Sequence, residues 1–181
     1  MKKLVLSAAV ALLALTVSAQ EISYGVLGGF NSTSVKISGL GSDFNSTSSE
    51  TGFAIGGFAD IELSDKISLQ PEVMYVAVKD FNTVGLNVIG KYNVTEEINV
   101  QLGPQLGFNS GDVVDAYDVL TGGDFSKIDL AVAFGAGYDI NENIFVQARY
   151  ALGLNNHFTG SDIGDAKFTV SSFGLSVGYR F

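Results

Sequence analysis

The chain has 181 residues, of which 46% are hydrophobic, 10 are basic and 19 are acidic, so its net charge is −9. This length predicts one domain, and the acidic excess argues against binding nucleic acid or anionic lipid through bulk charge. The sequence contains no cysteine, which excludes disulfides, thiolate catalysis and cysteine metal sites. After the amino-terminus there is no apolar run of about 18 residues, so we expect no membrane-spanning helix.

Residues 1–19 have the pattern of a secretory signal peptide. A basic pair, Lys2 and Lys3, precedes an apolar run of fourteen residues, and small residues follow up to Ala19. The run is shorter than the roughly 20 residues of a spanning helix, so a cleaved signal peptide is our interpretation and a buried core helix is the alternative. Residues 20–181 would then form the mature domain.

The rest of the chain repeats one unit eight times, in which about ten residues of alternating polarity are followed by turn residues. Alternation at period two predicts strands with one apolar face and one small or polar face. Strands of about 9–11 residues can cross a bilayer when tilted. The expected strands are residues 22–30, 51–63, 67–78, 83–94, 98–108, 127–140, 144–154 and 168–181.

The connections between these strands alternate in length. The second, fourth and sixth are tight and polar, whereas the others are longer or variable. Outer-membrane barrels have short periplasmic turns and longer extracellular loops, and an even strand number leaves both termini in the periplasm. The three long connections are expected to be loops at residues 31–50, 109–126 and 155–167.

The apolar faces of the expected strands have no second layer in the sequence to cover them. A soluble lipocalin-like barrel would have the opposite arrangement, apolar inside and polar outside. A closed barrel in lipid leaves no backbone edge unpaired, so we predict an all-β fold, an eight-stranded antiparallel transmembrane β-barrel with up-and-down meander order. We expect aromatic side chains at both membrane interfaces. Tyr92, Tyr138, Tyr179 and Phe181 should lie at the periplasmic interface, and Tyr75, Phe108 and Tyr150 nearer the outer one.

Charged side chains are expected inside the barrel. If the third and fourth strands form a hairpin centred just after Phe81, Glu72 lies opposite Lys91 and pairs with it. Side chains nearly fill an eight-stranded barrel, so we predict a plugged lumen; the alternative is that the charges form a gate or a proton path. The lumen charge cluster comprises Glu72, Lys91 and Arg149, the last reaching in from the far wall, with Asp60, Asp129 and Asp139 as further candidates.

His157, the one histidine of the sequence, lies in the last long connection together with Ser161 and Asp162. Serine hydrolysis requires a base within hydrogen-bond distance of the hydroxyl, and closeness in a loop sequence does not establish that geometry. We favour a solvated loop histidine and assign no catalytic residue.

The second long connection is acidic. Carboxylates are calcium ligands, but the spacing here lacks the EF-hand pattern. We therefore favour a solvated loop over a site for divalent cations bridging to lipopolysaccharide, and expect no metal or cofactor. The acidic residues are Asp112, Asp115, Asp118 and Asp124.

The carboxy-terminus, Val177-Gly178-Tyr179-Arg180-Phe181, resembles the assembly signal of outer-membrane proteins, hydrophobic-x-Tyr-x-Phe, carried here by Val177, Tyr179 and Phe181. Ser18-Ala19-Gln20 resembles signal cleavage regions in Bacteroidetes exports. The segments Leu69–Tyr75 and Gly90–Tyr92 resemble the small, PorT-like outer-membrane β-barrel domain proteins of that group. OmpX and the OmpA membrane domain are similar in size and strand number only.

This resemblance implies an integral outer-membrane protein. Such a protein is inserted by the barrel-assembly machinery and contacts lipopolysaccharide in the membrane. The expected role is structural or surface interaction through acidic loops, with an extracellular partner that no residue identifies. The alternatives are a narrow channel for small solutes, an accessory factor in protein secretion and a lipid A-modifying enzyme.

Overall fold

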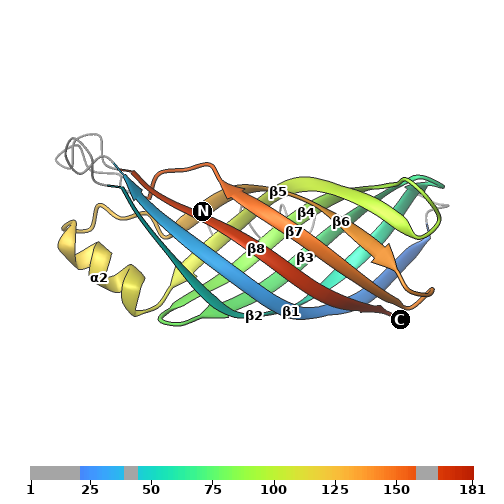
Figure 1. Cartoon of the computed structure of the whole chain (residues 1–181), viewed down its shortest axis with the longest axis horizontal. Coiled ribbons are helices and arrows are strands. Elements are labelled where there is room, and N and C mark those ends of the chain that lie inside the picture. The colour runs from blue at the N-terminus through green and yellow to red at the C-terminus, as the bar shows by residue number, and fades with distance from the viewer. Residues whose placement is uncertain (1–20, 39–44, 158–166) are drawn as a thin grey trace, which may run out of the picture.

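The computed structural model describes residues 21–38, 45–157 and 167–181. Its eight strands close into one antiparallel barrel in sequence order (Figure 1), which confirms the predicted meander. Each strand pairs with the next and β1 also pairs with β8. The strands are β1 (Ile22–Ser38), β2 (Asn45–Ser64), β3 (Ile67–Val78), β4 (Phe81–Asn93), β5 (Ile98–Ser110), β6 (Ile128–Asp139), β7 (Ile144–Gly153) and β8 (Lys167–Arg180).

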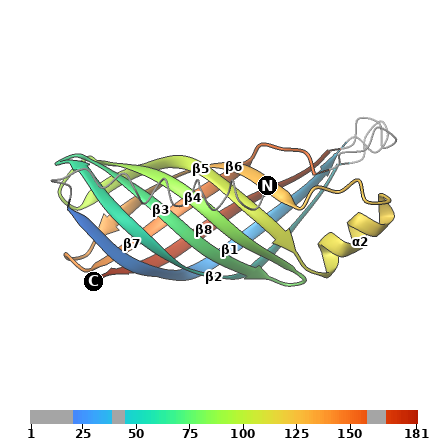
Figure 2. The ribbon, with the colours of Figure 1, turned by 180° about the vertical axis from the view of Figure 1, so that it is seen from behind.

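The two ends of the barrel differ. A short helix, α2 (Asp112–Leu120), lies at one end, and the carboxy-terminus lies at the other, as both ribbon views show (Figures 1 and 2). We call these the helix end and the turn end. The connections β2–β3, β4–β5 and β6–β7 lie at the turn end and are short, as the sequence predicts.

Two of the expected loops contain regular structure, so those predictions are wrong in part. β1 continues to Ser38 and β2 begins at Asn45, so most of the connection expected at residues 31–50 is hairpin. β-branched residues alternate along this part of β1 and favour strand. The other difference is α2, in which Asp112 and Asp115 occupy the first turn, where negative charge stabilises a helix.

The outer face of the barrel is apolar. The seven aromatic residues expected at the membrane interfaces are all exposed on it, and Leu102 near the middle of β5 is 62% exposed. Within the described residues no helix is long and apolar enough to cross a membrane. The outward apolar face agrees with a barrel in lipid and disagrees with the lipocalin-like alternative.

The interior is packed with apolar and aromatic side chains as well as polar ones. Phe58 and Phe145 meet edge to face with ring centroids 5.5 Å apart. Glycines make room for the two rings, because a Cβ on Gly178 would lie 2.1 Å from the Phe145 ring and one on Gly25 would lie 2.3 Å from the Phe58 ring. This lumen cluster comprises Leu27, Ala54, Phe58, Met74 and Phe145.

Candidate functional site

The centre of the lumen contains a hydrogen-bonded charge layer. Glu72 on β3 is fully buried, and its carboxylate accepts a hydrogen bond from Arg149 Nη1 at 2.7 Å. Gln70 and Asn87 donate to the same carboxylate at 2.6 and 3.0 Å. Arg149 also donates to Gln101 and Gln147. A buried charge pair of this kind is tolerated because additional hydrogen bonds satisfy both groups.

The expected pairing of Glu72 with Lys91 is wrong. The β3–β4 hairpin pairs Val78 with Phe81, which places Glu72 opposite Asn87. The centre of this hairpin lies nearer the start of the chain than we expected. The turn is formed by Lys79 and Asp80, and the φ angle of Asp80 is 58°. The register differs from our expectation by four residues, an even number, so every side chain keeps its predicted face.

Lys91 belongs instead to a second layer near the turn end. Its ammonium lies 2.6 Å from Asp60 Oδ2, and Arg180 donates to Asp139 at 2.6 Å. The two cations lie over the Phe145 ring, 5.7 and 4.5 Å from its centroid, at distances that allow cation–π attraction. Asp60 and Asp139 therefore lie inside the barrel, as expected, and the structure gives them Lys91 and Arg180 as partners.

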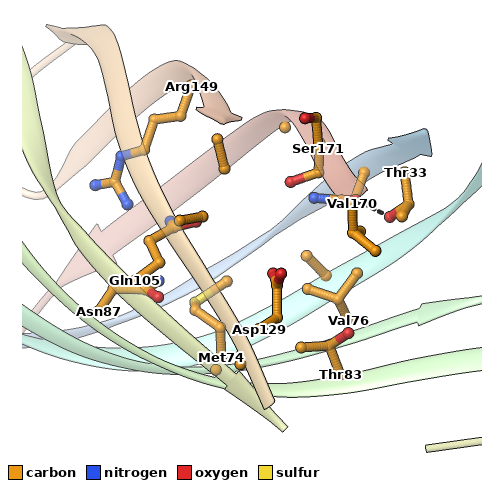
Figure 3. Close-up of a pocket in the computed structure, with 18 of the residues that line it drawn as sticks. Thr33, Met74, Val76, Thr83, Asn87, Gln105, Asp129, Arg149, Val170 and Ser171 are labelled. Atoms are coloured by element: carbon orange, nitrogen blue, oxygen red, sulfur yellow. Dashed lines mark hydrogen bonds between the residues drawn. The ribbon is translucent and has the colours of Figure 1, made fainter. Parts of the chain in front are cut away.

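The two layers separate two hollows. A vestibule of about 670 Å³ opens at the turn end, lined by Asp60, Lys91 and Arg180 among others. A cavity of about 110 Å³ lies on the helix side of the central layer and is lined by Arg149, Asn87 and further polar residues (Figure 3). Between the hollows lie Phe58, Phe145 and the charge layers.

A cluster of buried aromatic and valine side chains, the outer cap, lies at the helix end of the lumen. It joins side chains from β3, β4, β8, α2 and the β5–β6 connection, and Val35, Ile37 and Tyr117 pack against it. Two of its members, Phe81 and Val170, also line the cavity. The outer cap consists of Val78, Phe81, Val114, Phe125, Phe168 and Val170.

His157 lies inside this aromatic layer, so the expectation of a solvated histidine is wrong. Its side chain is 0% exposed, and its ring lies 5.6 Å from both the Phe125 and Phe168 rings. It bonds to the Ser126 carbonyl and to Asp129, which lines the cavity. Ser161 and Asp162 lie outside the described residues.

The acidic residues of the β5–β6 connection are partly neutralised. Lys127 lies 3.2 Å from Asp115 and 3.4 Å from Asp118, and hydrogen bonds to these two carboxylates raise the pKa of Lys127 above its ordinary value. Asp112 and Asp124 are exposed. No group of three metal-ligating side chains occurs in the part of the chain that the structure describes.

The residues expected to form the assembly signal lie on the outer face at the turn end. Val177, Tyr179 and Phe181 are exposed, and the Tyr179 and Phe181 rings lie 5.6 Å apart. The Phe181 amide donates to the Tyr24 carbonyl at 2.9 Å. The two PorT-like segments are neighbours in the wall, where Leu69 on β3 pairs with Gly90 on β4.

Sequence reasoning missed the aromatic filling of the lumen and the burial of His157. Phe145 lies four residues before Arg149, which we placed inside, so the alternation of faces along the strand could have located it. No comparable signal exists for His157, because its burial depends on three segments that are distant in the sequence.

The fold is similar to that of known surface barrels. Neisserial surface protein A (NspA) is 18% identical, with 89% of this chain and 99% of that chain covered and a TM-score of 0.52. Ail, the attachment invasion locus protein of Yersinia pestis, was solved in complex with the heparin analogue sucrose octasulfate. It is 16% identical over 89% of this chain and 99% of that chain, with a TM-score of 0.51. At these identities the likeness establishes the fold alone.

A search of curated protein sequences found no match. The family model described as "Outer membrane protein beta-barrel domain" matches residues 5–181. Together with the closed barrel and its apolar outer face, this match identifies an integral outer-membrane β-barrel protein, and the chain belongs to the outer membrane protein beta-barrel domain family.

Proposed function

We propose that this protein is a surface-interaction barrel that binds an extended segment of another protein along the free edge of β2. β2 pairs with β1 along its whole outer part, but it pairs with β3 only from Phe53 onward. Residues 45–52 therefore have a hydrogen-bonded neighbour on one side only among the described residues. This unpaired edge is the observation that carries the proposal.

The edge belongs to a three-stranded sheet that rises beyond the rim of the barrel at the helix end (Figure 1). β1 is its middle strand, because it pairs with β8 as far as Ser38 opposite Lys167. Val35 and Ile37 on β1 pack against the outer cap. This packing holds the edge in place before a partner arrives, which reduces the entropy lost on binding.

The composition of the edge supports docking. Exposed edge strands are commonly protected by lysine, proline or a bulge. Residues 45–52 contain neither lysine nor proline, and their register with β1 has no shift. Serine and threonine keep the edge soluble while leaving its backbone groups available for an added strand.

The partner that this edge fits is a protein segment rather than a polyanion. The chain has a net charge of −9 and the edge itself carries Glu50. The sulfated ligand named for Ail is therefore not carried over to this chain. The helix end faces the cell exterior in this proposal, because short turns in such barrels are periplasmic.

Peptide selection against the purified barrel tests the proposal. A peptide that binds should protect the backbone amides of residues 45–52 from hydrogen exchange. Thr47→Lys with Ser49→Lys should weaken that binding by about tenfold, or about 1.4 kcal/mol, because edge lysines oppose strand addition.

The matched control is Ser32→Lys with Ser34→Lys. These positions lie on the middle strand, where Ser34 is opposite Ser49. The control adds the same charge without changing a residue of the edge. Both lysine variants remove the hydrogen bond of 2.8 Å between the Ser34 and Ser49 hydroxyls, so the loss of this bond is matched. Selected peptides that protect other amides, or that bind both lysine variants equally, would refute edge docking.

The export route belongs to the same proposal. We infer that residues 1–19 are cleaved as a signal peptide, that the barrel-assembly machinery recognises the carboxy-terminus, and that the wall contacts lipopolysaccharide. The PorT-like segments support membership of that narrower Bacteroidetes group. We assign no enzymatic activity, no cofactor and no role in secretion.

A further inference from the structure

His157 is held by two hydrogen-bond acceptors. Nδ1 lies 2.7 Å from the backbone carbonyl oxygen of Ser126, and Nε2 lies 3.2 Å from Asp129 Oδ1. A carbonyl oxygen accepts hydrogen bonds only, and so does an ionised carboxylate. Both contacts are hydrogen bonds at once only when both ring nitrogens carry a proton, which is the imidazolium form.

A neutral ring would lose one of these two contacts. With its single proton on Nδ1, the imidazole keeps the bond to Ser126 and turns an Nε2 lone pair toward the carboxylate. Two acceptors in contact repel one another, and a buried polar atom without a partner is destabilising. With its single proton on Nε2, the imidazole instead keeps the bond to Asp129 and turns an Nδ1 lone pair toward the Ser126 carbonyl. The two contacts of His157 can therefore be hydrogen bonds at the same time only when the ring carries both protons.

This histidine connects the segments that form the outer cap. Its backbone carbonyl accepts from the Ser126 amide at 2.7 Å, and its amide donates to the Phe168 carbonyl at 3.0 Å. It therefore links the β5–β6 connection, the β7–β8 connection and β8. Asp129, on the other side of the contact, lines the lumen cavity (Figure 3).

We propose that His157 and Asp129 form a protonation-dependent latch, which holds the outer cap over the lumen cavity and loosens it when the imidazolium loses its proton. Loosening the cap exposes the cavity to the outside. This inference does not depend on the β2 edge, so either proposal can fail without the other.

Other charged groups around the latch are farther from the ring. Asp129 is the carboxylate in contact with it among the described residues. The α2 residue that packs on the same rings is Tyr117, a phenol. Lys127 is paired with α2 carboxylates on the surface, and Lys167 on β8 is exposed. The cap members from β3 and β4, Val78 and Phe81, are uncharged, as are the β1 residues packed on the cap.

The absence of cysteine from the sequence allows a direct test. Ser172→Cys places a single thiol in the cavity lining, and Ser49→Cys places one on the exposed edge of β2. A charged thiol reagent is added to the barrel in detergent or in cells at about pH 5.5 and about pH 8.5, on either side of the ordinary histidine value of about 6.5. Dividing the first labelling rate by the second removes the general effect of pH on thiol reactivity.

The latch predicts that this ratio rises by about tenfold between the lower and the higher pH. Asp129→Asn should abolish the rise, because an amide can present either its oxygen or its N–H group and so satisfies both forms of the ring. His157→Gln, which does not titrate, should also abolish it. Asp124→Asn, which neutralises an exposed carboxylate in the same connection, should leave it intact.

The proposal is overturned if the ratio in the otherwise wild-type chain is the same at both pH values. It is also overturned if the rise persists in a folded His157→Gln or Asp129→Asn variant. If one of these two variants fails to fold, the labelling ratio of the otherwise wild-type chain and that of the other variant still test the latch.

Discussion

At the scale of single residues, Glu72 is the position at which loss of one group leaves a buried charge unpaired. Removing the carboxylate by Glu72→Ala leaves Arg149 without its ion-pair partner inside the lumen. Breaking one side of a buried pair costs about 3–5 kcal/mol. We expect a loss of this size in the free energy of unfolding, measured by urea titration of the barrel refolded in lipid vesicles.

The control for this substitution is Glu96→Ala in the exposed β4–β5 turn. A surface carboxylate contributes at most about 1 kcal/mol, so its loss should have little effect. Equal losses at the two positions would show that the charge layer does not stabilise the barrel.

A second residue-scale prediction concerns the outer wall. Leu102→Arg should destabilise the barrel in a bilayer by about 2–4 kcal/mol, because the arginine would face the hydrocarbon. The matched control is Leu120→Arg at the end of α2, which is 78% exposed and lies beyond the barrel wall. If the two variants lose a comparable free energy of unfolding in the same vesicles, Leu102 is not exposed to lipid.

At the scale of elements, we predict that the closing strand β8 has a role in assembly that differs from its role in stability. The Phe181 side chain is 76% exposed, so its deletion removes little packing from the folded barrel. We expect the truncated chain to refold normally in detergent, yet to accumulate in the periplasm of living cells. The heat-modifiable gel mobility of the protein in membrane fractions measures how much of it is inserted as a folded barrel in cells.

Phe53→Ala is the comparison for this deletion. Phe53 is another exposed aromatic on the outer face, but it lies far from the terminus. This variant should reach the outer membrane at normal abundance. Normal insertion of the truncated chain, or its failure to refold in detergent, would remove the support for a terminal recognition signal.

The elements differ in how well their sequences identify them. Along each strand of the wall, apolar and polar or small residues alternate, because one face meets lipid and the other meets a crowded lumen. This alternation correctly predicts that Leu102 faces outward and that Arg149 faces the lumen. The residue that lies opposite each position on the neighbouring strand is harder to predict, since the position of a two-residue turn decides whether Glu72 lies opposite Lys91 or Asn87. A helix of 9 residues such as α2 is stabilised mainly by tertiary contact, and Val114 supplies that contact only once the barrel has closed.

At the scale of the whole molecule, the packed lumen predicts that the protein does not conduct ions. Phe58, Phe145 and the two charge layers lie between the vestibule and the cavity. Planar bilayers containing the wild-type barrel should show no stable pore. Phe58→Ala combined with Phe145→Ala should produce a measurable leak, because these two rings lie between the vestibule and the cavity.

The control for this experiment is Phe134→Ala on the outer face, which removes an equal ring without touching the lumen. Reproducible conductance of the wild-type protein, altered by Glu72→Ala, would favour the channel instead. In that case the charge layer would act as a gate.

The long hairpin of β1 and β2 has a mechanical consequence. Hydrogen bonds between antiparallel strands lie perpendicular to the strand direction. A partner bound along residues 45–52 and pulled away from the cell, nearly along the strands, would load these bonds in shear. Because strands loaded in shear separate only when many bonds break together, this geometry would resist flow far better than a contact that peels open one bond at a time.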